Sequence, residues 1–201
     1  KLLGVRESRP RPGLDDKVLV SWNALMISAF AKAGRILDRE DYTAHAKIAA
    51  SFILDNLRNP KTGRLCRYWR KGRADINADA SDYILLCGAM LDLFETTFNT
   101  QWIDWAVEFD EQAVALFFDS EKGIYYMNSV ESGNGVLFRP AFDGDNVMPS
   151  GNSAAVMNAV RLREITRNEK YEKRVRRILS AVSPELRQNP AGYAYLLGAF
   201  C

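Results

Sequence analysis

Hydrophobic positions divide the predicted helices of this chain into two kinds. One kind is apolar around most of its circumference, as expected for a helix with neighbours on both sides. These covered helices begin near Ser21, Ser81, Ser150 and Pro190. The other kind carries apolar side chains on one face only, at the 3.6-residue period of a helix that faces water. These one-sided helices span residues 40–57, 101–118 and 169–182.

The regular alternation of the two kinds of helix has a simple physical solution. Covered helices pack around a common axis, and each is backed by a one-sided helix whose far side meets water. The pattern therefore predicts an all-α fold, an α/α helical-hairpin toroid with three complete hairpins and the start of a fourth. We expect residues 1–201 to form one domain that is part of such a ring. Because the sequence begins at Lys1 without a methionine and ends directly after an apolar run, both ends are expected to be cut.

Two connectors in this pattern are long, residues 60–80 and residues 119–148. The second contains Tyr125-Tyr126, then Gly133-Asn134-Gly135, then Val136-Leu137-Phe138. Such a run predicts a small β-hairpin with a glycine-rich turn. Long loops on one side of a helical scaffold commonly form pocket walls, so we expect these connectors to border a site.

Composition narrows the possible partners and the compartment. The chain has 27 Lys and Arg against 25 Asp and Glu, so neither nucleic acid nor an anionic membrane is favoured. No apolar run is long enough to span a bilayer. Three cysteines at wide spacings, Cys66, Cys87 and Cys201, give no disulfide or metal framework and favour the reducing cytoplasm. No cofactor motif is present, and we expect neither a metal nor a cofactor.

The residues that could bind a ligand or catalyse a reaction lie where the covered helices begin. If all of them start at the same end of the toroid, the polar residues of three junctions converge there. These residues are Asp15, Asp16, Trp22 and Asn23 at the first junction, Asp79, Asp82 and Tyr83 at the second, and Asp145, Ser150 and Asn152 at the third. Carboxylates and amides pair with hydroxyl groups, and aromatic faces stack on sugar rings, so the set predicts a saccharide ligand. Asp16 and Asp82 are the candidate acid/base pair, and the other eight residues are expected to hold the ligand.

A purely structural interpretation competes at each junction. Asp16, Ser21, Asp82, Ser150 and Asn152 are all residue types that cap helix N-termini, and capping alone explains any one of them. Recurrence at three junctions favours a shared pocket, since repeat architectures often place binding residues on one face.

Three ordered motifs resemble one known family. Residues 11–17 (RPGLDDK) followed by residues 21–26 (SWNALM) are similar to the DDK…SWNGLM stretch of the YyaL-like family, which includes the spermatogenesis-associated thioredoxin-like proteins. Asp82-Tyr83 leading into residues 91–97 resembles its second motif, and Asp145 with residues 149–153 (PSGNS) its third. The chain departs from the family at Ala24, where glycine is usual, and in the residues that lead into Asp82.

The resemblance implies a thioredoxin-like domain followed by a six-hairpin toroid related in shape to sugar epimerases and glycosidases. This chain would be the C-terminal part of that toroid, and the remaining part of the same protein would be its partner. An epimerase that relies on histidine is disfavoured, because the single histidine, His45, belongs to an outer helix. Two functions stay open: a carboxylate-based carbohydrate-active enzyme, or a non-catalytic scaffold or binding module that works with the thioredoxin-like domain. The scaffold predicts polar groups satisfied internally and no open cavity.

Overall fold

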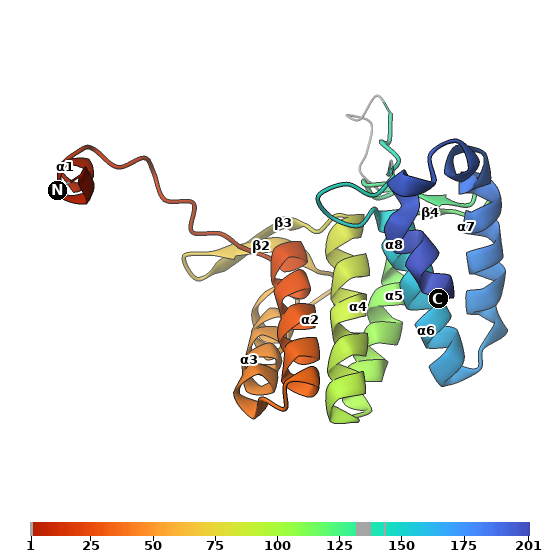
Figure 1. Cartoon of the computed structure of the whole chain (residues 1–201), viewed down its shortest axis with the longest axis horizontal. Coiled ribbons are helices and arrows are strands. Elements are labelled where there is room, and N and C mark those ends of the chain that lie inside the picture. Colours follow the sequence, from red (N-terminus) through yellow and green to blue (C-terminus); the bar gives the residue numbers. More distant parts are fainter. Residues whose placement is uncertain (1, 132–137, 143) are drawn as a thin grey trace.

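The computed structural model describes residues 2–131, 138–142 and 144–201 and confirms the predicted helical-hairpin toroid architecture (Figure 1). Inner and outer helices alternate along the chain, and each outer helix returns beside the inner helix before it. The inner helices are α2 (Val20–Ile36), α4 (Ala80–Thr97), α6 (Gly151–Thr166) and the short α8 (Ala194–Leu197). The outer helices are α3 (Glu40–Asn56), α5 (Gln101–Phe117) and α7 (Glu169–Gln188). Single 3₁₀ turns at Pro190–Tyr193 and Gly198–Phe200 flank α8.

Burial follows the two hydrophobic patterns. Helix α4 lies between α2 and α6 and buries residues all round, among them Asp82, Leu86 and Met90. Helix α7 buries one row at helical spacing, Tyr171, Val175, Ile178 and Val182, and leaves its charged side chains in water. The core therefore lies between the inner and outer layers.

Short strands decorate the end at which the inner helices begin. An antiparallel sheet has the order β1 (Val18–Leu19), β2 (Cys66–Arg70), β3 (Arg73–Asn77), with Trp69 opposite Val18 and Ala74. The turn between β2 and β3 has positive φ at Lys71 and Gly72, as a two-residue hairpin requires. The hydrophobic pattern of residues 60–80 predicted no strand in this first connector.

The second connector holds a smaller pair of strands. Strands β4 (Phe118–Asp119) and β5 (Ile124–Tyr125) are antiparallel. The hairpin predicted farther along, through Gly133-Asn134-Gly135 and Val136-Leu137, falls on residues 132–137, outside the described residues. At the other end of the chain, α1 (Leu2–Glu7) and the extended segment after it lie apart from the helical body (Figure 1).

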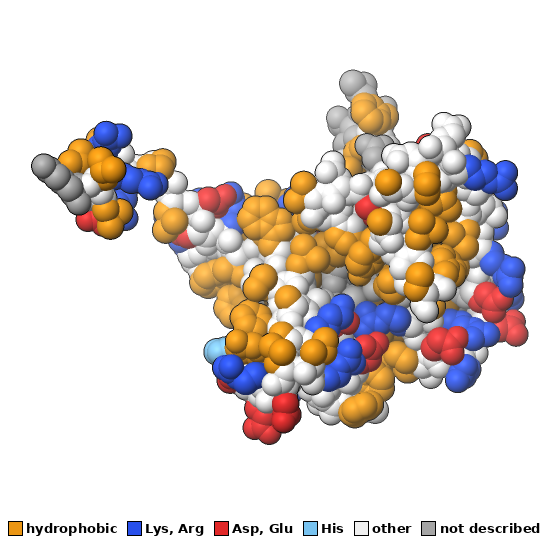
Figure 2. Space-filling view, in the orientation of Figure 1, with side chains coloured by type: hydrophobic (Ala, Val, Ile, Leu, Met, Phe, Trp, Pro, Cys, Tyr) orange, Lys and Arg blue, Asp and Glu red, His pale blue; other side chains and the backbone are white. Residues whose placement is uncertain are grey.

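A network of ion pairs ties the three long inner helices together near their C-terminal ends. The Asp92 carboxylate on α4, only 2% exposed, accepts Lys32 of α2 at 3.0 Å and Arg161 of α6 at 2.6 Å. Glu95, one turn on, binds the same Arg161 at 2.7 Å and Arg35 of α2 at 3.2 Å. Figure 2 shows acidic and basic side chains together over this part of the inner helices. The outer layer has its own buried link, the 2.6 Å pair between Asp110 of α5 and Arg174 of α7.

None of the helices described here combines the length and the apolar character needed to cross a membrane.

Replacing Asp92 with alanine tests the inner network. We expect a loss of about 2 kcal/mol in the free energy of unfolding, because Arg161 and Lys32 both lose a buried carboxylate partner while Arg161 keeps Glu95. Urea denaturation measures this loss. The matched control is Asp55→Ala on the exposed side of α3, which should change stability by less than about 0.5 kcal/mol. Equal effects of the two substitutions would contradict a structural role for the network.

Candidate functional site

The three long inner helices begin at the same end of the molecule, next to the strands and the long connectors (Figure 1). The structure therefore brings the three predicted junctions to one end, as the alternating pattern implied. The side chains at these junctions differ greatly in their exposure to solvent, and so in their accessibility to a ligand.

Asp82 is the most deeply placed of the predicted residues, with 0% of its surface exposed. Its Oδ1 accepts the backbone N–H of Ser21 at 2.9 Å, and its Oδ2 accepts the backbone N–H of Asp79 at 3.1 Å. The Asp79 side chain in turn accepts the Asp82 N–H at 3.2 Å, which completes a capping box at the start of α4. Asp82 thus joins the beginnings of α2 and α4.

Burial raises the pKa of Asp82 to about 6, and the neighbouring charge of Asp79 adds to the effect. These two causes outweigh the hydrogen bonds from Ser21 and Asp79, which favour the ionised form. A carboxyl group with such a pKa is suited to proton transfer near neutral pH. Both oxygen atoms, however, face the backbone of the chain.

The first junction is the accessible one. Asp15 and Asp16 are exposed on the segment before β1, where Asp15 pairs with Lys17 at 3.0 Å and Asp16 pairs with Arg70. Hydrogen bonds from Lys17 lower the pKa of Asp15. Trp22, in the first turn of α2, is 61% exposed. All three of these side chains are therefore open to solvent in this structure.

Asn23, beside Trp22, is half-buried and donates from Nδ2 to the carbonyl of Leu19 at 2.7 Å. Its amide nitrogen thereby closes the first turn of α2.

Strand β2 separates the acids of the first and second junctions. Asp16 binds Arg70, whereas Asp79 binds Arg67. Arg67 and Arg70 are three residues apart in one strand, so their side chains leave opposite faces of the sheet. Asp16 is open to solvent and Asp82 is covered, so one ligand cannot touch the carboxyl groups of both in this structure. Their assignment as an acid/base pair stays a prediction.

Tyr83 and Asn152 are almost fully buried and serve the backbone. The Tyr83 hydroxyl accepts the N–H of Leu65 at 2.9 Å. The Asn152 side-chain oxygen accepts the N–H of Tyr125 at 2.8 Å. Each ties the start of an inner helix to a long connector.

Asp145 and Ser150 organise the third junction. Asp145 accepts the N–H groups of Ser150 at 2.9 Å and Tyr195 at 2.8 Å, and its own N–H donates to Gly192 at 2.6 Å. Ser150 caps α6 by accepting the N–H of Ser153 at 3.2 Å. Asp145 therefore holds the starts of α6 and α8 together.

A polar cleft of about 290 Å³ lies beside the second junction, and Asp79 is its only lining residue among those predicted. Its other polar lining residues are Arg67, Asn77, Asn128, Ser129 and Glu131. They belong to the two long connectors, whose length was the only signal in the sequence that could have pointed to them.

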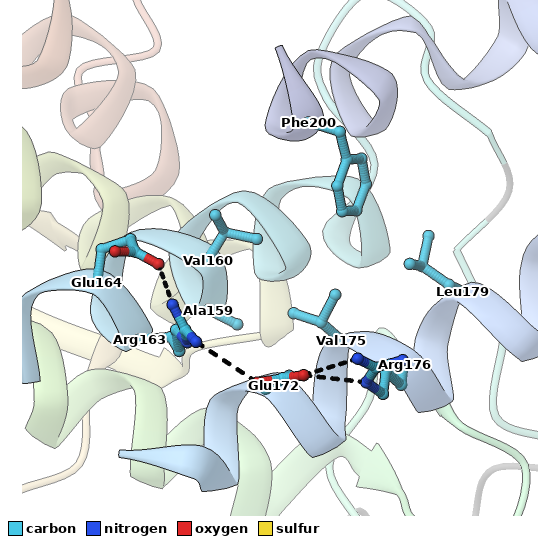
Figure 3. A pocket seen from close by; sticks show the side chains of 9 residues that line it. All are labelled: Ala159, Val160, Arg163, Glu164, Glu172, Val175, Arg176, Leu179 and Phe200. Atoms are coloured by element: carbon cyan, nitrogen blue, oxygen red, sulfur yellow. Dashed lines mark hydrogen bonds and ion pairs between the residues drawn. The ribbon is translucent and has the colours of Figure 1, made fainter. Parts of the chain in front are cut away.

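An apolar groove of about 390 Å³ lies away from the junctions, between α6 and α7 (Figure 3). Val160, Val175, Leu179 and Phe200 line it, and ion pairs of Glu172 with arginines border it. Across the described residues, no group of three or more His, Cys, Asp or Glu side chains is placed to hold a metal ion.

Asp82→Asn should change how stability depends on pH. The folded chain holds a proton on Asp82 up to about pH 6, whereas an unfolded aspartate releases it near pH 3.9. Stability from this group is therefore present below about pH 4 and is lost as pH rises to about 6. The free energy of unfolding, measured with urea at four pH values, should therefore decline less between about pH 4 and pH 6 in the variant than in the unmodified chain. An unchanged slope would contradict the raised pKa, and Asp55→Asn serves as the exposed control.

Asp145→Ala should destabilise the chain by about 1–3 kcal/mol, because the N–H groups of Ser150 and Tyr195 both lose their acceptor. Hydrogen exchange should quicken at Tyr195 more than at residues in the middle of α4. A uniform change along the chain would contradict a local role at the third junction.

The sequence of the chain is similar to that of curated proteins from several animals. No family model matches it. Spermatogenesis-associated protein 20 from Homo sapiens and its counterpart from Rattus norvegicus are each 30% identical to it over 207 aligned residues, 99% of this chain and 26% of theirs. The chain therefore spans about a quarter of the length of these curated relatives.

Solved structures share the fold at low sequence identity. A glycoside hydrolase family 76 α-mannanase from Bacteroides thetaiotaomicron has a TM-score of 0.68 at 15% identity, over 87% of this chain and 47% of that one. Cellobiose 2-epimerase from Bacillus thermoamylovorans has a TM-score of 0.66 at 17% identity, over 85% and 45%. An inactive α-1,6-mannanase variant from Salegentibacter, in complex with α-1,6-mannotriose, has a TM-score of 0.64 at 13% identity, over 90% and 50%. Over nearly its whole length the chain is therefore similar in sequence to about a quarter of spermatogenesis-associated protein 20, and it shares the α/α toroid fold of these carbohydrate-active proteins.

Proposed function

We propose that this chain forms part of a carbohydrate-active toroid and binds saccharide at the end where its inner helices begin. Structures of the same fold include a mannanase and a cellobiose epimerase, whose names assign them to carbohydrate substrates. One fold can serve many substrates, so the residues at that end decide what it binds.

The exposed pair Asp15-Asp16 is the observation that carries the proposal. It is the only pair of consecutive aspartates in the chain, and it lies directly before the sheet and α2. In the Salegentibacter mannanase, the inactive variant has two consecutive aspartates replaced by asparagine. Carboxylates that a ligand can reach are what glycoside hydrolysis needs, and Asp15 and Asp16 meet that condition whereas Asp82 does not.

The surroundings of the pair suit a polyhydroxylated ligand. Lys17 and Arg70 each balance one carboxylate and leave further N–H donors for hydroxyl groups. Asp82, buried below, would keep the starts of α2 and α4 in place.

A non-catalytic scaffold is the second candidate, and a specific observation favours it. Asp82, Tyr83 and Asn152 are buried and hydrogen-bonded to the chain's own backbone, as the scaffold interpretation predicted. In this alternative the chain would be a binding module beside a thioredoxin-like domain, and the helix starts would hold no ligand.

Saccharide binding by the chain and by its Asp15→Asn/Asp16→Asn double variant distinguishes the two candidates. Isothermal titration with α-1,6-mannotriose and with cellobiose should detect binding to the unmodified chain. The double variant should bind at least about ten-fold more weakly, a loss of about 1.4 kcal/mol, because it lacks both charged acceptors.

The matched control is Asp41→Asn, an exposed aspartate paired with Arg39 at the opposite end of the molecule, which should leave binding unchanged. Absence of binding to either saccharide, or equal binding by chain and double variant, would favour the scaffold.

A further inference from the structure

One side of α2 carries an apolar stripe that no other helix covers among the residues that the structure describes. Along it, Trp22 is 61% exposed, Met26 53% and Ile36 73%. Ile48 on the adjoining α3 is 67% exposed. Figure 2 shows hydrophobic side chains gathered over this part of the molecule. Large apolar side chains clustered in this way commonly mark an interface.

The next inner helix shows what covers such a stripe. Shifting the sequence by sixty residues aligns Ser21 with Ser81, and the exposed stripe of α2 then falls on a buried row of α4. In that row Trp22 corresponds to Asp82, Met26 to Leu86, Ala29 to Ala89 and Ala33 to Leu93. These four residues of α4 are 0% exposed, and the same side of α4 bonds to α2, through Asp82 to Ser21 and through Thr96 to Ala31. The stripe on α2 is thus the same helix face, one hairpin earlier in the ring.

A groove continues the stripe onto the outer layer. It measures about 370 Å³, lies between α2 and α3, and is lined by Met26, Ile27, Phe30, His45 and Ala49. At the opposite edge of the molecule, the groove between α6 and α7 receives Phe200, which follows the next inner helix (Figure 3). A groove between an inner helix and its outer partner is therefore where an adjoining hairpin places a side chain.

The lengths of the related proteins indicate which segment could pack against the edge formed by α2 and α3. The chain covers 47% of the mannanase chain of the same fold and 26% of the human relative. Roughly half of the ring is therefore supplied by other residues in such proteins, and a hairpin from those residues would meet this edge.

We infer that the edge formed by α2 and α3 is the seat of another helical hairpin from the same full-length polypeptide. Its inner helix would run parallel to α2, as α2 runs parallel to α4, and would cover Trp22, Met26 and Ile36. Its side chains toward α2 are small and apolar, as Ala24 and Ala31 are in the face of α2 that meets α4. Its outer helix covers Ile48 and the groove.

Methionine oxidation tests this surface without altering the sequence. The 201-residue chain and a full-length family member that carries it are treated briefly with hydrogen peroxide, and sulfoxide at each methionine is measured by mass spectrometry. Met26 should oxidise readily in the chain alone and about ten-fold more slowly in the full-length protein, because the hairpin covers it. Met90, fully buried, and Met148, exposed in the loop before α6, are the slow and fast internal controls.

Equal oxidation of Met26 in both proteins would overturn the inference. A second measurement tests the alternative occupant, another copy of the chain. If the 201-residue chain sediments as a dimer that Met26→Lys disrupts and Val147→Lys does not, the stripe is a self-association surface and the inference is also overturned. A monomeric chain with protection of Met26 only in the full-length protein supports it.

Discussion

A helix that is apolar around its whole circumference has to be covered on every side, and the arrangement of this molecule follows from that constraint. Helix α4 meets it fully, with α2 and α6 beside it and α5 behind. Each hairpin provides cover for the next, so stability is shared between neighbours. Within the part of the chain that the structure describes, the first inner helix, α2, lacks such a neighbour on one side and consequently keeps accessible apolar surface there.

A second constraint acts on the polar groups at the helix starts. The first backbone N–H groups of a helix have no partner within the helix, and these polar groups supply acceptors for them. Asp82 and Asp145 do this for α2 and α8 across long sequence separations. Asn152, at the start of α6, instead accepts the N–H of Tyr125 in β5. A residue engaged in this way has few lone pairs left for a ligand. The two carboxylates on which the proposed function depends, Asp15 and Asp16, lie outside this hydrogen-bonded core.

Periodicity predicted the helices well, because burial and period are linked directly. The expected outer helices at 40–57 and 101–118 match α3 and α5 to within a residue. Strands β2 and β3 were missed because Cys66–Arg70 mixes arginine with aromatic residues and turns at Lys71-Gly72. The convergence of the junctions could be predicted, but the burial of Asp82 could not, since its partner Ser21 is distant in sequence.

Parallel inner helices also have an electrostatic consequence. Each helix carries partial positive charge at its N-terminus and partial negative charge at its C-terminus, and aligned neighbours add rather than cancel along the inner layer. Lys32, Arg35 and Arg161 lie toward the negative ends and exceed the two acids they contact by one charge. This basic excess, together with the carboxylates of Asp79 and Asp82 at the N-terminal end of α4, offsets the aligned dipoles, so the side chains compensate for the cost of placing the inner helices parallel.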